Sequence, residues 1–134
     1  MGSFLSRFID GGTEVSRVSS FHSSDSWQLH FKNSEASSQL MVIDFTASWG
    51  GPCKLMKPVF KALSSTFKDV DFVKIDVGEL PDVAEEFKVK AMPTFVLVKK
   101  GKEVDRVVGR WVGARKYELQ EKIEEHRAQL LPST

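Results

Sequence analysis

An apolar run of strand length constrains the fold more than any other feature of this chain. Residues 40–45 read Leu-Met-Val-Ile-Asp-Phe, with a single polar interruption at Asp44. Alternating apolar and polar residues would predict a strand with one solvent-exposed face, whereas a continuous apolar run indicates a strand covered on both faces. A strand of this kind needs a sheet with helices packed on each side. We therefore expect an α/β fold.

The segments around this run supply the other elements of such a sheet. Residues 70–77 predict a second core strand, and residues 94–98 and 103–108 flank a short turn at Gly101, which predicts an antiparallel hairpin. Helices are expected at four places: around Trp27 and Phe31, from Gly51 to Phe67 with a kink at Pro58, from Pro81, and from Ala114 to Leu131. This order of elements predicts a central mixed β-sheet flanked by helices on both faces.

Length and composition favour one domain. The chain has 134 residues, 41% of them hydrophobic, which suffices for one packed core. Residues 1–17 mix serine, glycine and charge without a sustained period, so we expect a flexible N-terminal extension before a domain at residues 18–134. The 19 basic and 18 acidic residues leave no excess that would attract nucleic acid.

The sequence has few residues that could bind a metal and no long apolar segment. Cys53 is the only cysteine, and His22, His30 and His126 lie far apart, so neither an internal disulfide nor a metal or cofactor site is expected. No apolar run approaches the roughly 20 residues of a membrane span. The amino terminus also lacks the apolar core of a secretory signal, so a cytoplasmic location is expected.

The first six residues, Met1 to Ser6, fit the pattern M-G-x-x-x-[ST] for acylation. In that pattern Gly2 accepts a myristoyl chain after Met1 is removed. So short a motif also occurs by chance, and that alternative stays open. One acyl chain gives only marginal, reversible binding, so at most a transient membrane contact follows.

A six-residue motif, WGGPCK at residues 49–54, follows the first core strand and opens the second predicted helix. With Asp44 upstream and the AMPT stretch at residues 91–94 before the hairpin, the chain resembles the thioredoxin family across about residues 18–131. The family signature is Trp-Cys-Gly-Pro-Cys-Lys, matched here at five of six positions. The extension and residues 103–106 and 117–123 are similar to the plant h type. The resemblance implies a thioredoxin fold and dithiol–disulfide oxidoreductase activity in electron transport and cell redox homeostasis.

The departure from that signature falls on the residue that attacks the substrate. A thiolate at a helix start is stabilised by unpaired N–H groups and the helix dipole, and the family places its attacking sulfur there, at the position of Gly50. Cys53 matches the sulfur that resolves the mixed disulfide. The resemblance therefore implies a protein that is inactive as a disulfide reductase. The alternative that Cys53 is only a small buried hydrophobe stays open.

Two charged residues match the family's proton-handling pair. A carboxylate such as Asp44 within an apolar strand is costly unless it is neutral or paired. The resemblance implies that Asp44 moves the proton of Cys53 and that Lys74 lies near Asp44; a purely structural buried pair is the alternative. An ionised carboxylate beside a thiol disfavours the thiolate, so a fast monothiol enzyme acting through Cys53 is not expected.

A substrate groove is also implied by the resemblance. Pro93 matches the family's cis-proline, whose turn can leave the backbone of Met92 free to pair with an extended peptide. Residues 108–111 and 112–115 form a near repeat, Val-Gly-Arg-Trp and Val-Gly-Ala-Arg, so the glycine of the rim is either Gly109 or Gly113. The expected groove comprises Trp49, Gly51, Pro52, Met92, Pro93 and one of these glycines.

Three functions remain open at this stage. The first is a member of the oxidoreductase family disabled at Gly50, by engineering or by natural divergence; with a cysteine there, its partners would be disulfide-containing proteins and thioredoxin reductase. The second is a redox-independent peptide-binding or holdase module that uses the Pro93 groove. The third is a monothiol protein that forms mixed disulfides through Cys53.

Overall fold

The computed structural model describes residues 15–109 and 112–127. Within these ranges the elements follow in the order β1 (Val18–Ser20), α2 (Ser24–Ser34), β2 (Met41–Thr46), α3 (Gly51–Thr66), β3 (Asp71–Asp76), α4 (Pro81–Glu86), β4 (Thr94–Lys99), β5 (Lys102–Val108) and α5 (Val112–His126). In this part of the chain, no helix is both long enough and apolar enough to cross a membrane.

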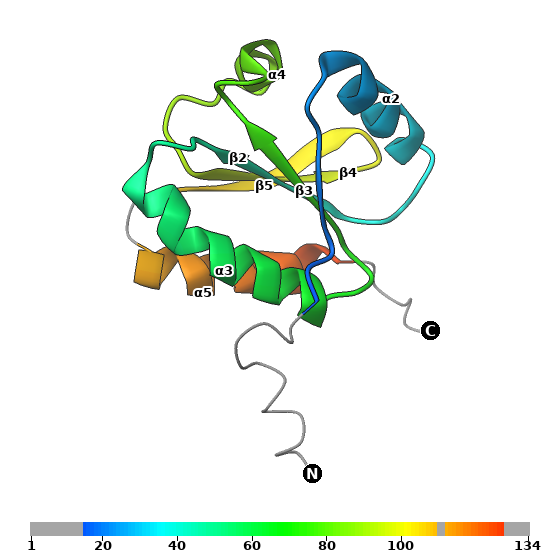
Figure 1. Cartoon of the computed structure of the whole chain (residues 1–134). Coiled ribbons are helices and arrows are strands. Elements are labelled where there is room, and N and C mark those ends of the chain that lie inside the picture. Colours follow the sequence, from blue (N-terminus) through cyan, green and yellow to red (C-terminus); the bar gives the residue numbers. More distant parts are fainter. Residues whose placement is uncertain (1–14, 110–111, 128–134) are drawn as a thin grey trace, which may run out of the picture.

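The strands form one mixed sheet in the order β1-β3-β2-β4-β5. β3 pairs in parallel with both β1 and β2, whereas β4 runs antiparallel to β2 and to β5. Helices α2 and α4 cover one face of this sheet, and α3 and α5 cover the other (Figure 1). The predicted α/β class with a mixed sheet flanked on both faces is therefore confirmed.

Strand β2 has apolar side chains on both faces because it lies between the two layers of helices. Leu40, just before β2, and Val42 pack in a cluster with Met56 and Phe60 of α3. Met41, Ile43 and Phe45 pack on the opposite face with Trp27 of α2. Side chains alternate along a strand, so Asp44 shares the α3 face with Leu40 and Val42.

Two ends of the structure differ from the expected elements. Val18–Ser20 forms an edge strand that pairs with residues 72–74 of β3, although no strand was expected there. Three residues are too short to show a period, so this pairing depends on a long-range contact. α5 begins at Val112, two residues before the expected start; its expected end at Leu131, like Arg110 and Trp111, lies outside the described residues.

Candidate functional site

The site is built where β2 turns into α3. Gly50 has extended backbone dihedrals and caps α3, and its carbonyl accepts a hydrogen bond from the N–H of Lys54 at 3.2 Å. Pro52 lies in the first turn, where a missing N–H costs nothing because that donor has no partner within the helix. Trp49 precedes the cap and is 67% exposed. The loop thus closes over the start of α3 and presents one indole to solvent.

The thiol of Cys53 lies beneath this loop. Its side chain is 7% exposed and is a free cysteine. The sulfur accepts a hydrogen bond from the N–H of Ala47, with 3.4 Å between nitrogen and sulfur. Little of Cys53 is therefore accessible to a reactant from solvent.

The backbone at Gly50 faces that sulfur. A Cβ added at Gly50 would lie 3.8 Å from Cβ of Cys53 and 3.3 Å from its Sγ. In disulfides the two Cβ atoms lie about 3.5–4.5 Å apart, with a mean near 3.8 Å. At Gly51, in contrast, an added Cβ would meet no atom within 4 Å. Positions 50 and 53 therefore have the separation of a disulfide pair, whereas Gly51 faces open space.

Asp44 is the buried charged group of the site. Its side chain is 6% exposed, and its Oδ1 has no hydrogen-bond partner among the described residues. Burial raises the pKa of Asp44 from its ordinary value of 3.8 to about 7, although the positive charge of Lys74, directly opposite in β3, acts in the other direction. The group can therefore take up or release a proton near neutral pH.

One pocket brings the predicted chemical residues together. Asp44, Cys53 and Lys74 line a pocket of about 220 Å³ beside the start of α3. A second pocket, of about 160 Å³ and on the β1 side, shares Asp44 and Lys74. Both are also lined by Lys57, which the sequence analysis did not single out. Its spacing of four residues from Cys53 on a helix is the signal that could have found it.

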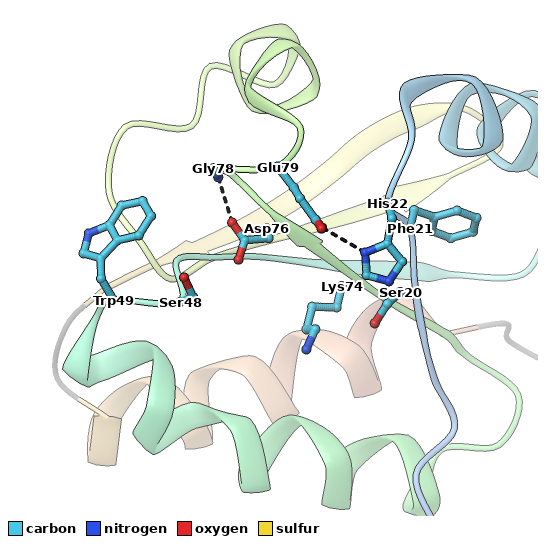
Figure 2. Close-up of a pocket in the computed structure, with 9 residues that line it drawn as sticks. All are labelled: Ser20, Phe21, His22, Ser48, Trp49, Lys74, Asp76, Gly78 and Glu79. Carbon is cyan, nitrogen blue, oxygen red and sulfur yellow. Dashed lines mark hydrogen bonds and ion pairs between the residues drawn. The ribbon is translucent and has the colours of Figure 1, made fainter.

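A larger pocket opens at the carboxyl ends of the parallel strands β2 and β3. It measures about 440 Å³ and extends from Trp49 to the ion pair of His22 and Glu79, whose Nδ1 and Oε1 lie 2.9 Å apart (Figure 2). Asp76 lies between them and accepts a hydrogen bond from the N–H of Gly78 at 2.8 Å. The sequence analysis missed this pocket, although the carboxyl ends of adjacent strands are a common place for one.

The remaining groove residues lie around β4. The Met92–Pro93 peptide bond is cis, Met92 is half-buried and Pro93 is buried. The N–H of Gly109 points at the carbonyl of Pro93, with 3.4 Å between nitrogen and oxygen. Gly113 lies in the first turn of α5, and Gly2 falls outside the described residues. Gly109, one of the two candidate rim glycines, therefore contacts Pro93 through its backbone.

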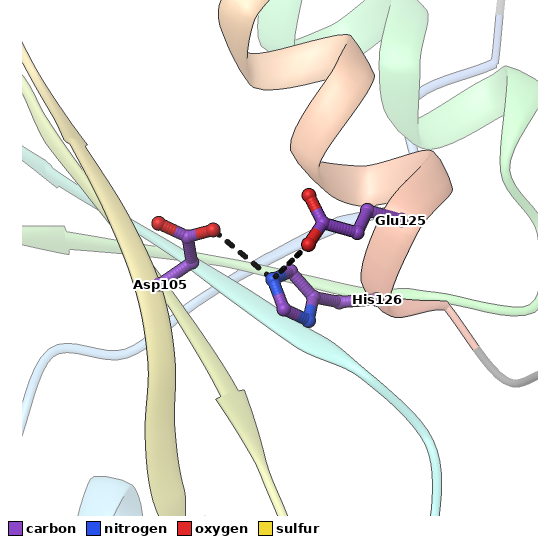
Figure 3. A group of neighbouring side chains, drawn as sticks. All are labelled: Asp105, Glu125 and His126. Carbon is purple, nitrogen blue, oxygen red and sulfur yellow. Dashed lines mark hydrogen bonds and ion pairs between the residues drawn. The ribbon is translucent and has the colours of Figure 1, made fainter.

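A separate group of Asp105, Glu125 and His126 has the composition of a metal site. Nε2 of His126 lies 3.0 Å from Asp105 Oδ2 and 3.7 Å from Glu125 Oε2 (Figure 3). The ammonium of Lys122, however, lies 3.0 Å from Asp105 Oδ1. Burial raises the pKa of Asp105, but hydrogen bonds from His126 and Lys122 outweigh it and leave the pKa below its ordinary value. The group is therefore an ion-pair cluster that joins β5 to α5.

The comparisons with known proteins agree on one family. The family model described as thioredoxin matches residues 19–125. Thioredoxin H2 of Arabidopsis thaliana is 55% identical over 116 residues, which cover 87% of this chain and 84% of the relative. Thioredoxin H2-2 of Oryza sativa subsp. japonica is 47% identical over 131 residues, with 92% and 93% covered. The crystal structure of thioredoxin NaTrxh from Nicotiana alata superposes with a TM-score of 0.82 and 58% identity, covering 88% of this chain and 99% of that one.

Proposed function

The chain belongs to the thioredoxin family and is similar to its plant h-type members, and we propose that it is a member whose disulfide chemistry lacks one sulfur, at Gly50. With a cysteine at position 50, its thiolate would attack a substrate disulfide, form a mixed disulfide and release one substrate thiolate. The sulfur of Cys53 would then attack the sulfur at position 50 and release the second substrate thiol. With Gly50 the first step has no nucleophile, so the chain does not turn over disulfides.

The observation that carries this proposal is the geometry between Gly50 and Cys53. The separation of 3.8 Å between an added Cβ and Cβ of Cys53 equals the mean for disulfides. Gly50 is the N-cap of α3 and Cys53 the third residue of the helix, positions whose side chains are close at helix starts, so a sulfur at position 50 would lie beside Cys53 without rearrangement of the backbone. The backbone therefore supports a two-sulfur site from which only the first sulfur is absent.

The other residues of the site suit that chemistry. Asp44 and Cys53 line the same pocket, and the pKa of about 7 lets Asp44 accept the proton that Cys53 must lose before it attacks. Lys74 lies opposite Asp44 in the sheet and stabilises the carboxylate that results from proton release. We propose that these two residues control the loss of the Cys53 proton before Cys53 attacks the sulfur at position 50. Both residues are present in the Gly50 form as well.

The proposed partners follow from the exposed side of the site. Trp49 is 67% exposed, and with Gly51, Pro52, Met92 and Pro93 it would hold an extended segment of a disulfide-containing protein. A thioredoxin reductase would recharge a form with a cysteine at position 50. We also keep as proposals a cytoplasmic location and a transient membrane contact through acylated Gly2.

The test compares three proteins in a disulfide-reduction assay with insulin as substrate and dithiothreitol as the electron source. The parent chain should not exceed the rate with dithiothreitol alone, whereas Gly50→Cys should accelerate reduction catalytically. Gly51→Cys is the matched control, because it adds the same thiol one residue away where an added Cβ faces open space. Acceleration by the parent chain, or equal acceleration by both variants, would contradict the proposal.

A binding module without turnover is the second candidate, favoured by the exposed Trp49 beside the site. If it holds, the parent chain should bind a reduced, unfolded polypeptide, and Trp49→Ala should weaken that binding several-fold. Tryptophan is enriched among the residues that contribute most of the binding energy at interfaces, so its removal should weaken binding measurably. A monothiol role for Cys53 is less favoured, because its side chain is only 7% exposed and shares a pocket with Asp44.

A further inference from the structure

Helix α3 carries two apolar faces, and the sheet covers only one of them. Met56, Phe60 and Leu63 are buried in the core cluster. A second stripe, formed by Leu55, Pro58, Val59 and Ala62, occupies a different side of the helix. Leu55 is 62% exposed, and Val59 and Ala62 are half-buried. We call these four residues the outer stripe of α3.

Three residues of the outer stripe, Pro58, Val59 and Ala62, line a groove between α3 and α5, and Leu55 lies beyond it along α3. A pocket of about 350 Å³ lies there, lined on α3 by Pro58, Val59, Ala62, Leu63 and Thr66 and on α5 by Lys116 and Gln120. Helices α3 and α5 lie side by side on the same face of the sheet (Figure 1). The groove is therefore mainly apolar along its α3 wall, with Thr66 at one end, and polar along its α5 wall, which suits an amphipathic segment.

The chain that precedes β1 approaches this groove. The N–H of Arg17 donates to Oγ of Ser64 at 3.0 Å, and the carbonyl of Val15 accepts from Oγ of Ser65 at 3.1 Å. Successive helical residues are about 100° apart around the axis, so the chain moves around α3 as it is followed from Arg17 back to Val15. This rotation is directed toward Ala62 and the rest of the outer stripe.

The preceding segment has a sequence that fits the groove. Phe4 and Phe8, like Leu5 and Ile9, are four residues apart, so the four side chains share one face if the segment is helical. The six residues from Ile9 to Val15 span up to roughly 20 Å. Leu55 lies only ten residues from Ser65 on the helix, or about 15 Å. The apolar block can therefore reach the whole outer stripe.

We propose that residues 4–9 dock in the groove between α3 and α5, with Phe4, Leu5, Phe8 and Ile9 against the outer stripe. This would bury an apolar surface two residues from Cys53 on the same helix, because Leu55 forms the end of the stripe nearest the site. On this proposal the N-terminal extension is not freely flexible, because residues 4–9 bind a defined site between α3 and α5. The proposal concerns a different face from the disulfide chemistry and does not depend on it.

Paramagnetic relaxation in the full chain tests the docking. A nitroxide is attached at Ser6→Cys in a Cys53→Ser background, so that a single thiol is labelled. Amide signals of Leu55, Val59 and Ala62 should lose most of their intensity, while signals on the opposite face of the sheet, such as that of Lys32 in α2, should be retained. Loss confined to the neighbourhood of Ser65, or spread evenly over the surface, would overturn the proposal.

Two controls identify the occupant. The same labelled protein with Phe4→Ser and Phe8→Ser should regain the intensity at Leu55 and Val59, because the apolar contact is removed while the tether keeps its length. In a mixture of spin-labelled chains without isotope and isotope-labelled chains without spin label, the same signals should be unaffected. Broadening of these amide signals in the mixture would show that the N-terminal segment of a second copy binds the groove. That result would overturn the proposal of intramolecular docking.

Discussion

Replacing Asp44 by asparagine should stabilise the folded chain at pH 8 and change its stability little at pH 4. In the unfolded chain the carboxyl group ionises near its ordinary pKa of 3.8, whereas in the folded chain it holds its proton up to about pH 7. Between these values the folded state binds more protons than the unfolded state, so the free energy of unfolding falls as the pH rises. Asparagine has no such ionisation, so the variant avoids this loss.

The magnitude follows from the size of the pKa shift. The pKa of Asp44 moves from 3.8 to about 7, and each unit is worth about 1.4 kcal/mol, so the full effect is on the order of 4 kcal/mol. Asp44 lines two pockets that are large enough to hold water molecules. Water there lowers the desolvation cost, and we expect a gain for Asp44→Asn of about 2–4 kcal/mol at pH 8.

Urea unfolding of both proteins between pH 4 and pH 8 measures this difference. All other titratable groups are shared, so the difference between the two free energies of unfolding isolates Asp44. It should be small at pH 4, grow through pH 5 to 7 and level off above pH 7. A difference that does not change with pH, or a variant that is less stable than the parent at pH 8, would refute the assignment of a buried carboxyl with a raised pKa.

Three further substitutions test separate parts of the structure. Lys74→Met removes the positive charge that lowers the pKa of Asp44, so a carboxyl titration followed by NMR should show that pKa above its value in the parent; an unchanged or lower value would exclude the pair. Trp27→Ala removes a ring that is 1% exposed and packs with Met41, Ile43 and Phe45, and urea unfolding should show a loss of about 3–5 kcal/mol; a loss below about 1 kcal/mol would contradict that burial. Gly101→Ala places a Cβ at φ +77 and 2.7 Å from Cγ of Glu35, so the melting temperature should fall by several degrees, in keeping with a cost of about 1–2 kcal/mol; an unchanged melting temperature would contradict the left-handed turn.

The central strand of the fold was predictable because its apolar run is continuous. The run at residues 40–45 has no alternation, which predicted a strand covered on both faces, and the two clusters on either side of β2 confirm that interpretation. β1 was missed because three residues, of which only Val18 is half-buried, carry no period. Its place in the sheet depends on pairing with β3, more than 50 residues later in the chain.

Single residues of the candidate site could be singled out from the sequence, but their neighbours in the fold could not. A lone carboxylate at Asp44 in an apolar strand is visible in the sequence. Its neighbours depend on the register between β2 and β3, which pairs Asp44 with Lys74 and Thr46 with Asp76. No local pattern specifies that register, so Asp76 and Lys57 became visible as pocket residues only in the folded chain.

The thiol count of Gly50→Cys before and after oxidation tests the central claim most directly. The claim is that positions 50 and 53 form a disulfide site from which one sulfur is absent, based on the separation of 3.8 Å between an added Cβ and Cβ of Cys53. After mild oxidation, alkylation and intact-mass analysis, Gly50→Cys should be a monomer with no free thiol, and reduction should restore two thiols. Gly51→Cys, treated in the same way, should keep its thiols or form linked dimers. A Gly50→Cys protein that is folded yet keeps two free thiols as a monomer after oxidation, while other dithiol proteins oxidise fully, would contradict the claim.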